Sequence, residues 1–337
     1  MYFRNITGHA REKEILEKAM RGGRVAHSYL FTGPLGVGKR TLALEFARAL
    51  NCRAGTIGEE VPCGVCEDCV ALGRGSHPNF VDIGPEDKDG VRTESGLIRI
   101  GRVRELQAAI RYKSGGGKKV AVIDGADKME ARAANALLKT LEEPPGDSVI
   151  VLITPRPETL LPTIISRCQR INFRPLSESV VKDFLRERGV APGEGASVAA
   201  RLGAGSISAA LKYSEAGVIE KRREIVERLA LLDGDDIGGI LGLAGELSAR
   251  GDLADILEFL KTWCRDVTVW SEGNTGLMVN GDLTGFIKKK RAGFRALADS
   301  FDMIERARYD VTPPRYANKL LVMESLLLGL ARKGALV

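Results

Sequence analysis

Short continuous apolar runs and longer amphipathic segments alternate along the first half of the chain. The continuous runs are Ser28–Thr32, Lys119–Ile123 and Val149–Thr154, and each is bounded by polar or glycine-rich sequence. Apolar runs of this length are typical of strands in a parallel sheet that is covered on both faces. They therefore predict an α/β domain with a central parallel sheet.

Between these runs, apolar residues recur at helical spacing. Helices are predicted over Glu12–Met20, Thr41–Leu50, Ile98–Ile110 and Ala131–Glu142, the third preceded by a short extended piece. In the last helix the apolar residues share one stripe, and the prolines that follow stop it because proline has no N–H to donate.

The rest of the chain is helical in pattern. A small segment runs from Pro175 to about Tyr213, and a larger one from about Glu215 to Val337 contains a loop at Ser271–Asp282. A chain of 337 residues exceeds the size of one ordinary core. We therefore expect three domains: an α/β domain over residues 1–173, a small helical domain over 174–213, and a larger helical domain over 214–337.

Composition is that of a soluble globular protein. Apolar residues make up 44% and charged residues 28%. No apolar stretch approaches the roughly 18 residues of a membrane-spanning helix, and the N-terminal sequence lacks a signal-peptide core, so we expect a cytoplasmic protein without membrane association. The excess of 50 Lys and Arg over 44 Asp and Glu permits contact with nucleic acid without requiring it.

A glycine-rich loop between the first predicted strand and the next helix matches a phosphate-binding motif. It reads Gly33-Pro-Leu-Gly36-Val-Gly38-Lys39, the G-x-x-x-x-G-K core of a P-loop. The glycines let backbone N–H groups approach a phosphate at a helix N-terminus, and Lys39 adds a positive charge. The loop predicts binding of ATP or ADP, and the alternative is a glycine-rich turn without a ligand.

The residues that usually hold Mg²⁺ and activate water are altered. Arg40 follows Lys39, where a Ser or Thr hydroxyl normally coordinates the metal. Thr41 does not replace that hydroxyl, because one residue along a helix turns the side chain by about 100°. Asp124 ends a predicted strand, but Gly125 stands where the carboxylate that activates water is expected. We therefore expect a degenerate nucleotide site that disfavours metal binding and hydrolysis.

Four of the six cysteines cluster directly behind the P-loop helix. Cys52, Cys63, Cys66 and Cys69 have the spacing C-x10-C-x2-C-x2-C. The two short gaps let consecutive sulfurs converge on one ion, and the longer loop lets Cys52 complete a tetrahedron, which predicts structural Zn²⁺ in a module over residues 52–69. An iron–sulfur cluster is the alternative, although the Cys-Pro that follows in ferredoxins is absent, and free thiols are another. Four thiolates leave a zinc ion no open position for catalysis.

Other features have simple structural interpretations. Cys168 and Cys264 lie far from the cluster in sequence and are expected to be small buried apolar residues. Trp263 and Trp270 recur at helical spacing, which is typical of a core or a subunit contact. The basic run Lys288–Arg291 is typical of a solvated face, with DNA contact as the alternative.

Longer stretches of sequence carry a family resemblance. They are His27–Gly33, the four-cysteine module, Ala133–Pro145 and Leu161–Cys168, which ends in Ser-Arg-Cys. With these pieces the chain resembles the clamp-loader branch of the AAA+ family over residues 1 to about 173, and beyond that only the helical layout agrees. The resemblance implies an AAA+ P-loop domain, a small helical lid domain, and an all-α collar domain that packs against other subunits.

The resemblance also implies roles for individual residues. In clamp loaders the Ser-Arg-Cys motif presents an arginine to ATP bound in the neighbouring subunit, and its counterpart here is Arg167. A planar guanidinium at this position offsets the negative charge of the phosphate group that is being transferred. The alternative is that Arg167 pairs with a structural carboxylate. Thr154 occupies the position where the resemblance implies a polar residue that senses the γ-phosphate of ATP. Motor subunits resemble one another in carrying Asp-Glu and Gly-Ser-Leu-Arg, where this chain has Asp124-Gly125 and, over Gly205–Ser208, Gly-Ser-Ile-Ser.

Three functions remain as hypotheses. The first is a non-motor, stator-like clamp-loader subunit that joins motor and delta subunits in a ring, supplies Arg167 in trans, and helps load the sliding clamp onto primed DNA. The second is an ATP-hydrolysing motor subunit of the same assembly, which uses Lys39, Thr41 and Asp124 with Asp127 as the base. The third is an unrelated nucleotide-dependent switch or DNA-binding module, for which the sequence has no base-reading motif.

Overall fold

The structure is a computed structural model that describes residues 2–54, 61–111, 116–190, 194–231, 235–288, 294–311 and 317–332. The chain divides into two units: Met1–Val180 with Gly205–Ser208, and Val181–Ala204 with Ala209–Val337. The second unit therefore combines most of the small helical segment with the C-terminal helices. The division into three domains, with boundaries at residues 173 and 213, stays a prediction.

A five-stranded parallel sheet forms the centre of the first unit, with the order β2-β3-β4-β1-β5. The strands are β1 (Ser28–Thr32), β2 (Phe80–Ile83), β3 (Lys119–Asp124), β4 (Ser148–Thr154) and β5 (Gln169–Asn172). Every residue of β1 and β4 is buried, in agreement with their continuous apolar sequences. The edge strands β2 and β5 were not predicted, because an edge position removes the need for a continuous apolar run.

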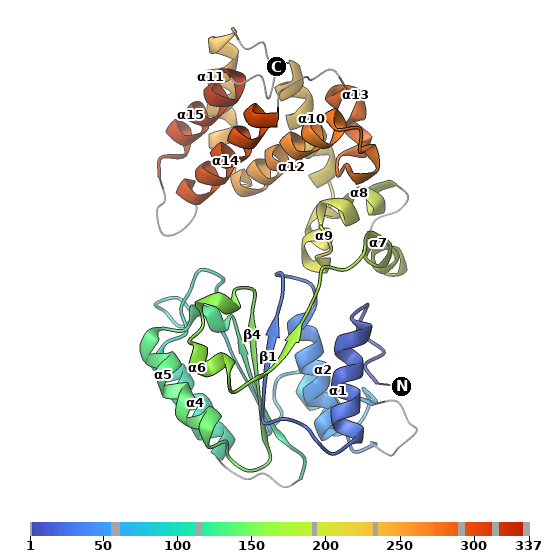
Figure 1. Cartoon of the computed structure of the whole chain (residues 1–337), viewed down its shortest axis with the longest axis vertical. Helices are drawn as coiled ribbons and strands as arrows, with labels where there is room; N and C mark the ends of the chain where they lie inside the picture. The colour runs from blue at the N-terminus through green and yellow to red at the C-terminus, as the bar shows by residue number, and fades with distance from the viewer. Residues whose placement is uncertain are drawn as a thin grey trace. The chain divides into compact units, whose positions relative to one another are not determined.

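Helices cover both faces of this sheet, with α1 and α2 on one face and α4 and α5 on the other (Figure 1). Their bounds are α1 (Ala10–Arg21), α2 (Lys39–Asn51), α4 (Ile100–Arg111) and α5 (Ala131–Glu142), and α3 (Glu67–Gly73) and α6 (Pro162–Ile165) are shorter. Successive residues of β1 point to opposite faces. Phe31 therefore joins the core beneath α2, whereas Leu30 joins the core beneath α4 and α5.

The strand register places polar residues side by side at the edge of the sheet that is formed by the carboxyl ends of the strands. Thr32 at the end of β1 lies opposite Thr154 at the end of β4, and Asp124 at the end of β3 lies opposite Ile153. In an open parallel sheet, ligands bind at the carboxyl ends of the strands. The P-loop, Asp124 and Thr154 meet at this edge, and the α/β fold with a central parallel sheet that the sequence predicted is confirmed.

Helices make up the described part of the second unit, apart from turns and connections. They are α8 (Glu194–Leu202), α10 (Val218–Leu231), α11 (Ile237–Ser248), α12 (Leu253–Ser271), α13 (Thr284–Ile287), α14 (Phe294–Val311) and α15 (Lys319–Arg332), while α7 (Glu178–Glu187) and α9 (Ile207–Tyr213) cross the boundary between the units. Trp263 and Cys264 on α12 are buried, as expected, and Trp270 is half-buried. Among all the described helices, none combines the length and apolar character that a membrane span needs.

A buried polar cluster holds the predicted 271–282 loop against helices α10 and α12 of the second unit. Arg222 on α10 is fully buried, donates a hydrogen bond to Asn280 Oδ1, and pairs with Asp282. Asp266 on α12 accepts hydrogen bonds from the Val279 N–H at 3.0 Å and from Asn280 Nδ2 at 2.8 Å. Burial lowers the pKa of Arg222, and the carboxylate of Asp282 opposes that shift. The loop is therefore held by charge-assisted hydrogen bonds.

Candidate functional site

The P-loop connects the end of β1 to the first turn of α2, with Gly38 as the N-cap of that helix. Gly33 has φ 134°, and a Cβ there would lie 2.2 Å from the carbonyl oxygen of Phe173. Gly36 has φ 71°, in the left-handed region that glycine adopts without strain. The loop thus carries glycine at two positions where a side chain would clash or strain the backbone.

Lys39 turns its ammonium group back onto the loop. Its Nζ donates to the Gly33 carbonyl at 2.6 Å and also to the Pro34 carbonyl. Burial lowers the pKa of Lys39 to about 8, while Asp124 and Asp127 act in the opposite direction. The cation is thus held mainly by neutral carbonyls. An anionic phosphate would be a stronger partner, because charge-assisted hydrogen bonds are the strongest kind.

Two guanidinium groups surround the carboxylates where a metal would be expected. Arg40 donates to Asp82 Oδ2, and its Nε lies 3.6 Å from Asp124 Oδ2. Arg92, in the loop after β2, places Nη1 2.9 Å from Asp82 Oδ2 and Nη2 3.3 Å from Asp124 Oδ2. Burial raises the pKa of Asp124, and the two arginines oppose that shift. Thr41 is exposed in the first turn of α2.

Asp127, the candidate base of the motor hypothesis, is held by its own chain. Its Oδ1 accepts a hydrogen bond from Thr154 Oγ1 at 3.0 Å, and its Oδ2 accepts from Arg156 Nη2 at 2.8 Å. The Asp127 side chain is 1% exposed. Thr154 is fully buried, and its hydroxyl also accepts the Arg156 N–H at 3.0 Å. Both predicted residues therefore lie at the expected edge, in contact with each other.

The Gly205–Ser208 stretch lies against the P-loop within the first unit. The Ser208 N–H donates to the Gly36 carbonyl at 3.2 Å. A Cβ on Gly36 would lie 2.3 Å from Ser206 Oγ and 2.8 Å from Ser208 Cβ. Small hydroxyl residues thus contact the loop from the stretch where motor subunits carry an arginine.

Residues at this site that the sequence did not reveal include His9, Arg92 and Asp82, the acidic partner of Arg92. Buried His9 has its Nε2 2.7 Å from the Val37 carbonyl oxygen of the P-loop, and its ring packs edge-on against Phe173. A lone histidine and one arginine among many carry no spacing signal, so only the folded chain reveals their positions.

Arg167 lies between α6 and β5. Its Nη2 is 2.7 Å from Glu142 Oε1 at the end of α5, and its Nη1 donates to the Thr163 carbonyl at 2.9 Å. The carboxylate pairing that the sequence left as an alternative is therefore present in the single chain. Because the two side chains are 35% and 49% exposed, such a pair contributes only about 0–1 kcal/mol. Ser28 Oγ donates to the Arg167 carbonyl at 2.6 Å and so anchors its backbone.

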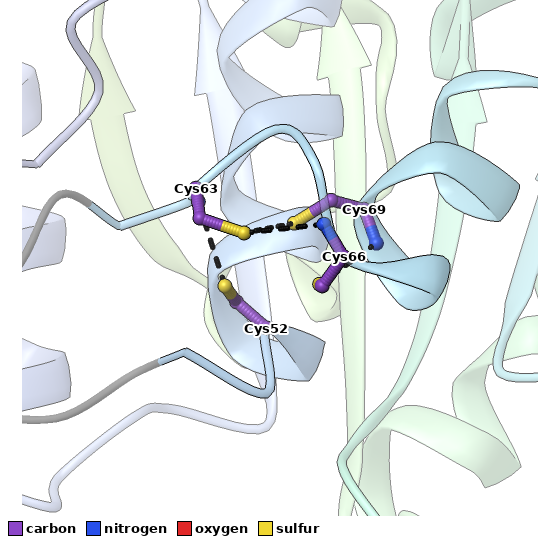
Figure 2. A group of neighbouring side chains, drawn as sticks. All are labelled: Cys52, Cys63, Cys66 and Cys69. Carbon is purple, nitrogen blue, oxygen red and sulfur yellow. Dashed lines mark hydrogen bonds between the residues drawn. The ribbon is translucent and has the colours of Figure 1, made fainter.

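The four clustered cysteines converge on one point (Figure 2). Their sulfurs lie within 4.8 Å of one another, and the Sγ atoms of Cys63 and Cys69 are 4.0 Å apart. Tetrahedral zinc with Zn–S bonds of about 2.3 Å requires sulfurs about 3.8 Å apart, so the donor set fits that metal. The backbone N–H of Cys66 donates to Cys63 Sγ at 3.4 Å, and such bonds lower the pKa of Cys63 to about 6.

Other sequence predictions fall outside these sites. Cys168 is half-buried, and burial raises its pKa to about 11, which makes it an unreactive thiol. In the basic run, Lys288 places Nζ 5.2 Å from the centre of the Trp270 ring. Residues 289–291 lie outside the described residues, and DNA contact by this run stays a prediction.

Comparison with known proteins shows similarity along nearly the whole chain. A family model described as "DNA polymerase III, delta subunit" matches residues 8–177. DNA polymerase III subunit delta' of Pseudomonas aeruginosa is 32% identical over 324 residues, which cover 91% of this chain and 92% of that protein. The subunit delta' of Bacillus subtilis is 40% identical over 184 residues, 54% of this chain and 52% of that one. The tau subunit of Bacillus subtilis is 35% identical over 179 residues, 53% of this chain and 30% of that protein.

Proposed function

The chain belongs to the family of DNA polymerase III delta' subunits, and from this premise we propose that it is the non-motor, stator-like subunit of a clamp loader. In this role it assembles with motor and delta subunits in a ring and helps load the sliding clamp onto primed DNA. It acts in the cytoplasm as a component of the DNA polymerase III holoenzyme. The similarity to a tau subunit supports the proposal that the chain assembles with subunits of the same fold.

The arrangement around Asp124 is the observation that supports a non-motor role. A magnesium ion on this carboxylate would have to share it with the guanidinium groups of Arg40 and Arg92. Gly125 has no carboxylate, and the carboxylate of Asp127 is occupied by Thr154 and Arg156. A P-loop NTPase needs both a bound metal and a residue that positions water. We infer that this chain does not turn over ATP by itself.

Arg167 is the group that we propose acts on another subunit's ATP. Its pairing with Glu142 is exposed and therefore contributes little. A neighbouring ATP would compete well for it, because phosphates and guanidinium groups form strong bidentate hydrogen bonds. The hydrogen bond from Ser28 to the backbone supports this role, since it anchors the arginine to the edge of β1.

Zinc is the metal that we propose for the four cysteines. Bound zinc would join the end of α2 to the start of α3 through Cys52 and Cys66. All four of its positions would be filled by the protein, so the ion would stabilise the module and would have no open position for substrate.

The motor hypothesis remains the second candidate because the P-loop is intact and the tau subunit is 35% identical over the matched residues. It requires Asp127 to leave Thr154 and Arg156 and to activate water. The buried hydrogen bonds of Asp127 oppose that movement.

ATP turnover by the isolated full-length chain separates the two candidates. We expect no turnover above background, whereas a motor subunit measured in parallel should hydrolyse ATP. A rate on the order of 1 per second, with the activity following the chain through purification, would contradict the non-motor role.

The variant Gly125→Glu, which would restore a carboxylate at this position, is a poor test of the missing carboxylate. Gly125 has φ 76°, and a Cβ there would lie 3.2 Å from Pro85 Cγ.

A further inference from the structure

The P-loop keeps the groups that hold a polyphosphate. Lys39 is 5% exposed, and its ammonium group points to the loop carbonyls rather than to a carboxylate. Gly38 caps α2, whose first N–H groups face the loop. A buried ammonium, a helix N-terminus and a glycine loop together form an anion site.

A divalent cation does not fit beside this loop. In P-loop NTPases, Mg²⁺ is held by a hydroxyl after the P-loop lysine and by a strand-end aspartate. Here the first position is Arg40, and Asp124 Oδ2 already faces both Arg40 and Arg92. Asp82 is taken by the same two guanidinium groups. A metal on either carboxylate would therefore have to displace two positive groups or lie beside them.

The loop after β2 positions Arg92 beside the carboxylates of Asp82 and Asp124. Gly84 has no side chain, and a Cβ there would lie 2.6 Å from Arg92 Nε. Backbone hydrogen bonds between Glu86 and Leu97, at 3.1 Å and 3.0 Å, close the base of the same loop. Arg92 is therefore positioned by the fold, and it joins a cluster with an excess of positive charge. The cations Lys39, Arg40, Arg92 and Arg156 outnumber the carboxylates of Asp82, Asp124 and Asp127.

We propose that this P-loop binds a polyphosphate, as ADP, ATP or inorganic pyrophosphate, without a divalent cation, and that Arg40 and Arg92 supply the charge that Mg²⁺ supplies in P-loop NTPases. The bound polyphosphate is then a fixed ligand of the fold and is not consumed. The inference does not depend on Arg167, so the two roles are tested separately.

The test is a calorimetric titration of the full-length chain with ADP, ATP and pyrophosphate, in EDTA and again in excess magnesium chloride. We expect binding in EDTA that is at least as tight as binding in magnesium chloride, because the site does not need the metal and magnesium complexes the free polyphosphate in solution. Binding that is tenfold or more tighter with magnesium overturns the inference, and so does an absence of binding in both buffers. ADP tighter than pyrophosphate identifies a nucleotide as the ligand, and equal affinity identifies the bare polyphosphate; both results support the site.

Variants test which residues bind the polyphosphate and which replace the metal. Lys39→Ala should weaken binding at least tenfold, which places the ligand at the P-loop. Arg40→Thr restores a hydroxyl at the metal position and should make binding at least fivefold tighter with magnesium than with EDTA. Arg104→Thr, an exposed arginine on α4, is the matched control and should behave as the parent chain. A folded Arg40→Thr chain that remains indifferent to magnesium would count against the role of Arg40.

Discussion

Arg40 shows how one residue changes the chemistry of a P-loop. Its position directly after Lys39 identified it in the sequence as a lost metal ligand. The structure adds that its guanidinium reaches Asp82 on the edge strand β2. Asp82 was not predicted as a site residue, because β2 is an edge strand of only four residues. An arginine that replaces the hydroxyl thus removes a ligand and also adds a competing cation.

Arg167→Ala should lower ATP hydrolysis by the reconstituted clamp loader to about the rate of the sites that Arg167 does not serve, while the complex still assembles. A lost arginine finger typically reduces turnover by several orders of magnitude, although other subunits in a ring keep their own sites. Arg167→Lys should be nearly as impaired, because an ammonium group cannot reproduce the planar fork. Hydrolysis is measured at saturating ATP and assembly by size-exclusion chromatography.

Glu142→Gln is the matched control for that experiment. It removes the partner of Arg167 but keeps the shape of the side chain, and the half-exposed pair contributes little to folding. We expect hydrolysis by the complex to stay within about twofold of the parent complex and stability to change by less than about 1 kcal/mol. Normal hydrolysis with Arg167→Ala would remove the basis for the in-trans role.

At the scale of elements, the cysteine module depends on short turns that aim sulfur atoms inward. Cys66 is the N-cap of α3, and its Sγ accepts the Cys69 N–H at 3.4 Å. The same geometry recurs at Cys63, whose Sγ accepts the Cys66 N–H. These N–H groups stabilise thiolates, which are the form that binds a metal.

The purified chain should contain about one zinc ion and no iron, as measured by elemental analysis. Removal of the metal should lower the thermal midpoint of the first unit, because folding and metal binding are coupled. Zinc should be released as the pH falls, since protons compete with the metal for the thiolates. Cys66→Ser should lose zinc, whereas Cys168→Ser should retain it. An iron-containing chain would support the ferredoxin-like alternative instead.

Most elements of the first unit were predictable because their sequences are locally consistent. The range predicted for α5 is the observed range, and the central strands differ from prediction by at most one residue. The helix predicted from Ile98 begins at Ile100, because Ile98 instead forms a bridge with Met129. Edge strands such as β5, with only Ile171 buried, leave no pattern of this kind.

At the scale of the whole molecule, the two units have separate stabilising interactions. The first unit is built on its sheet and the cysteine module. The second relies on helix packing and on the buried cluster of Arg222, Asp266 and Asn280. A protein of this kind need not unfold in one step.

Arg222→Ala should destabilise the second unit by about 3–5 kcal/mol, because the variant removes one partner of a buried charge pair. Hydrogen exchange measured by mass spectrometry should show faster exchange in α10 and α12 and unchanged protection in β3 and β4. Arg223→Ala, an exposed neighbour on the same helix, serves as the control. Uniform loss of protection in both units would show that they unfold together.

The sequence alone determined the P-loop, the four cysteines, the central strands and the changed positions at Arg40 and Gly125, because each depends on residues close together in the chain. Only the tertiary structure decided which cations face Asp124, that Glu142 pairs with Arg167, and that Arg222 holds a distant loop. These contacts join residues that lie 25 to 84 positions apart. Burial and strand order select such partners, and neither can be read from local spacing.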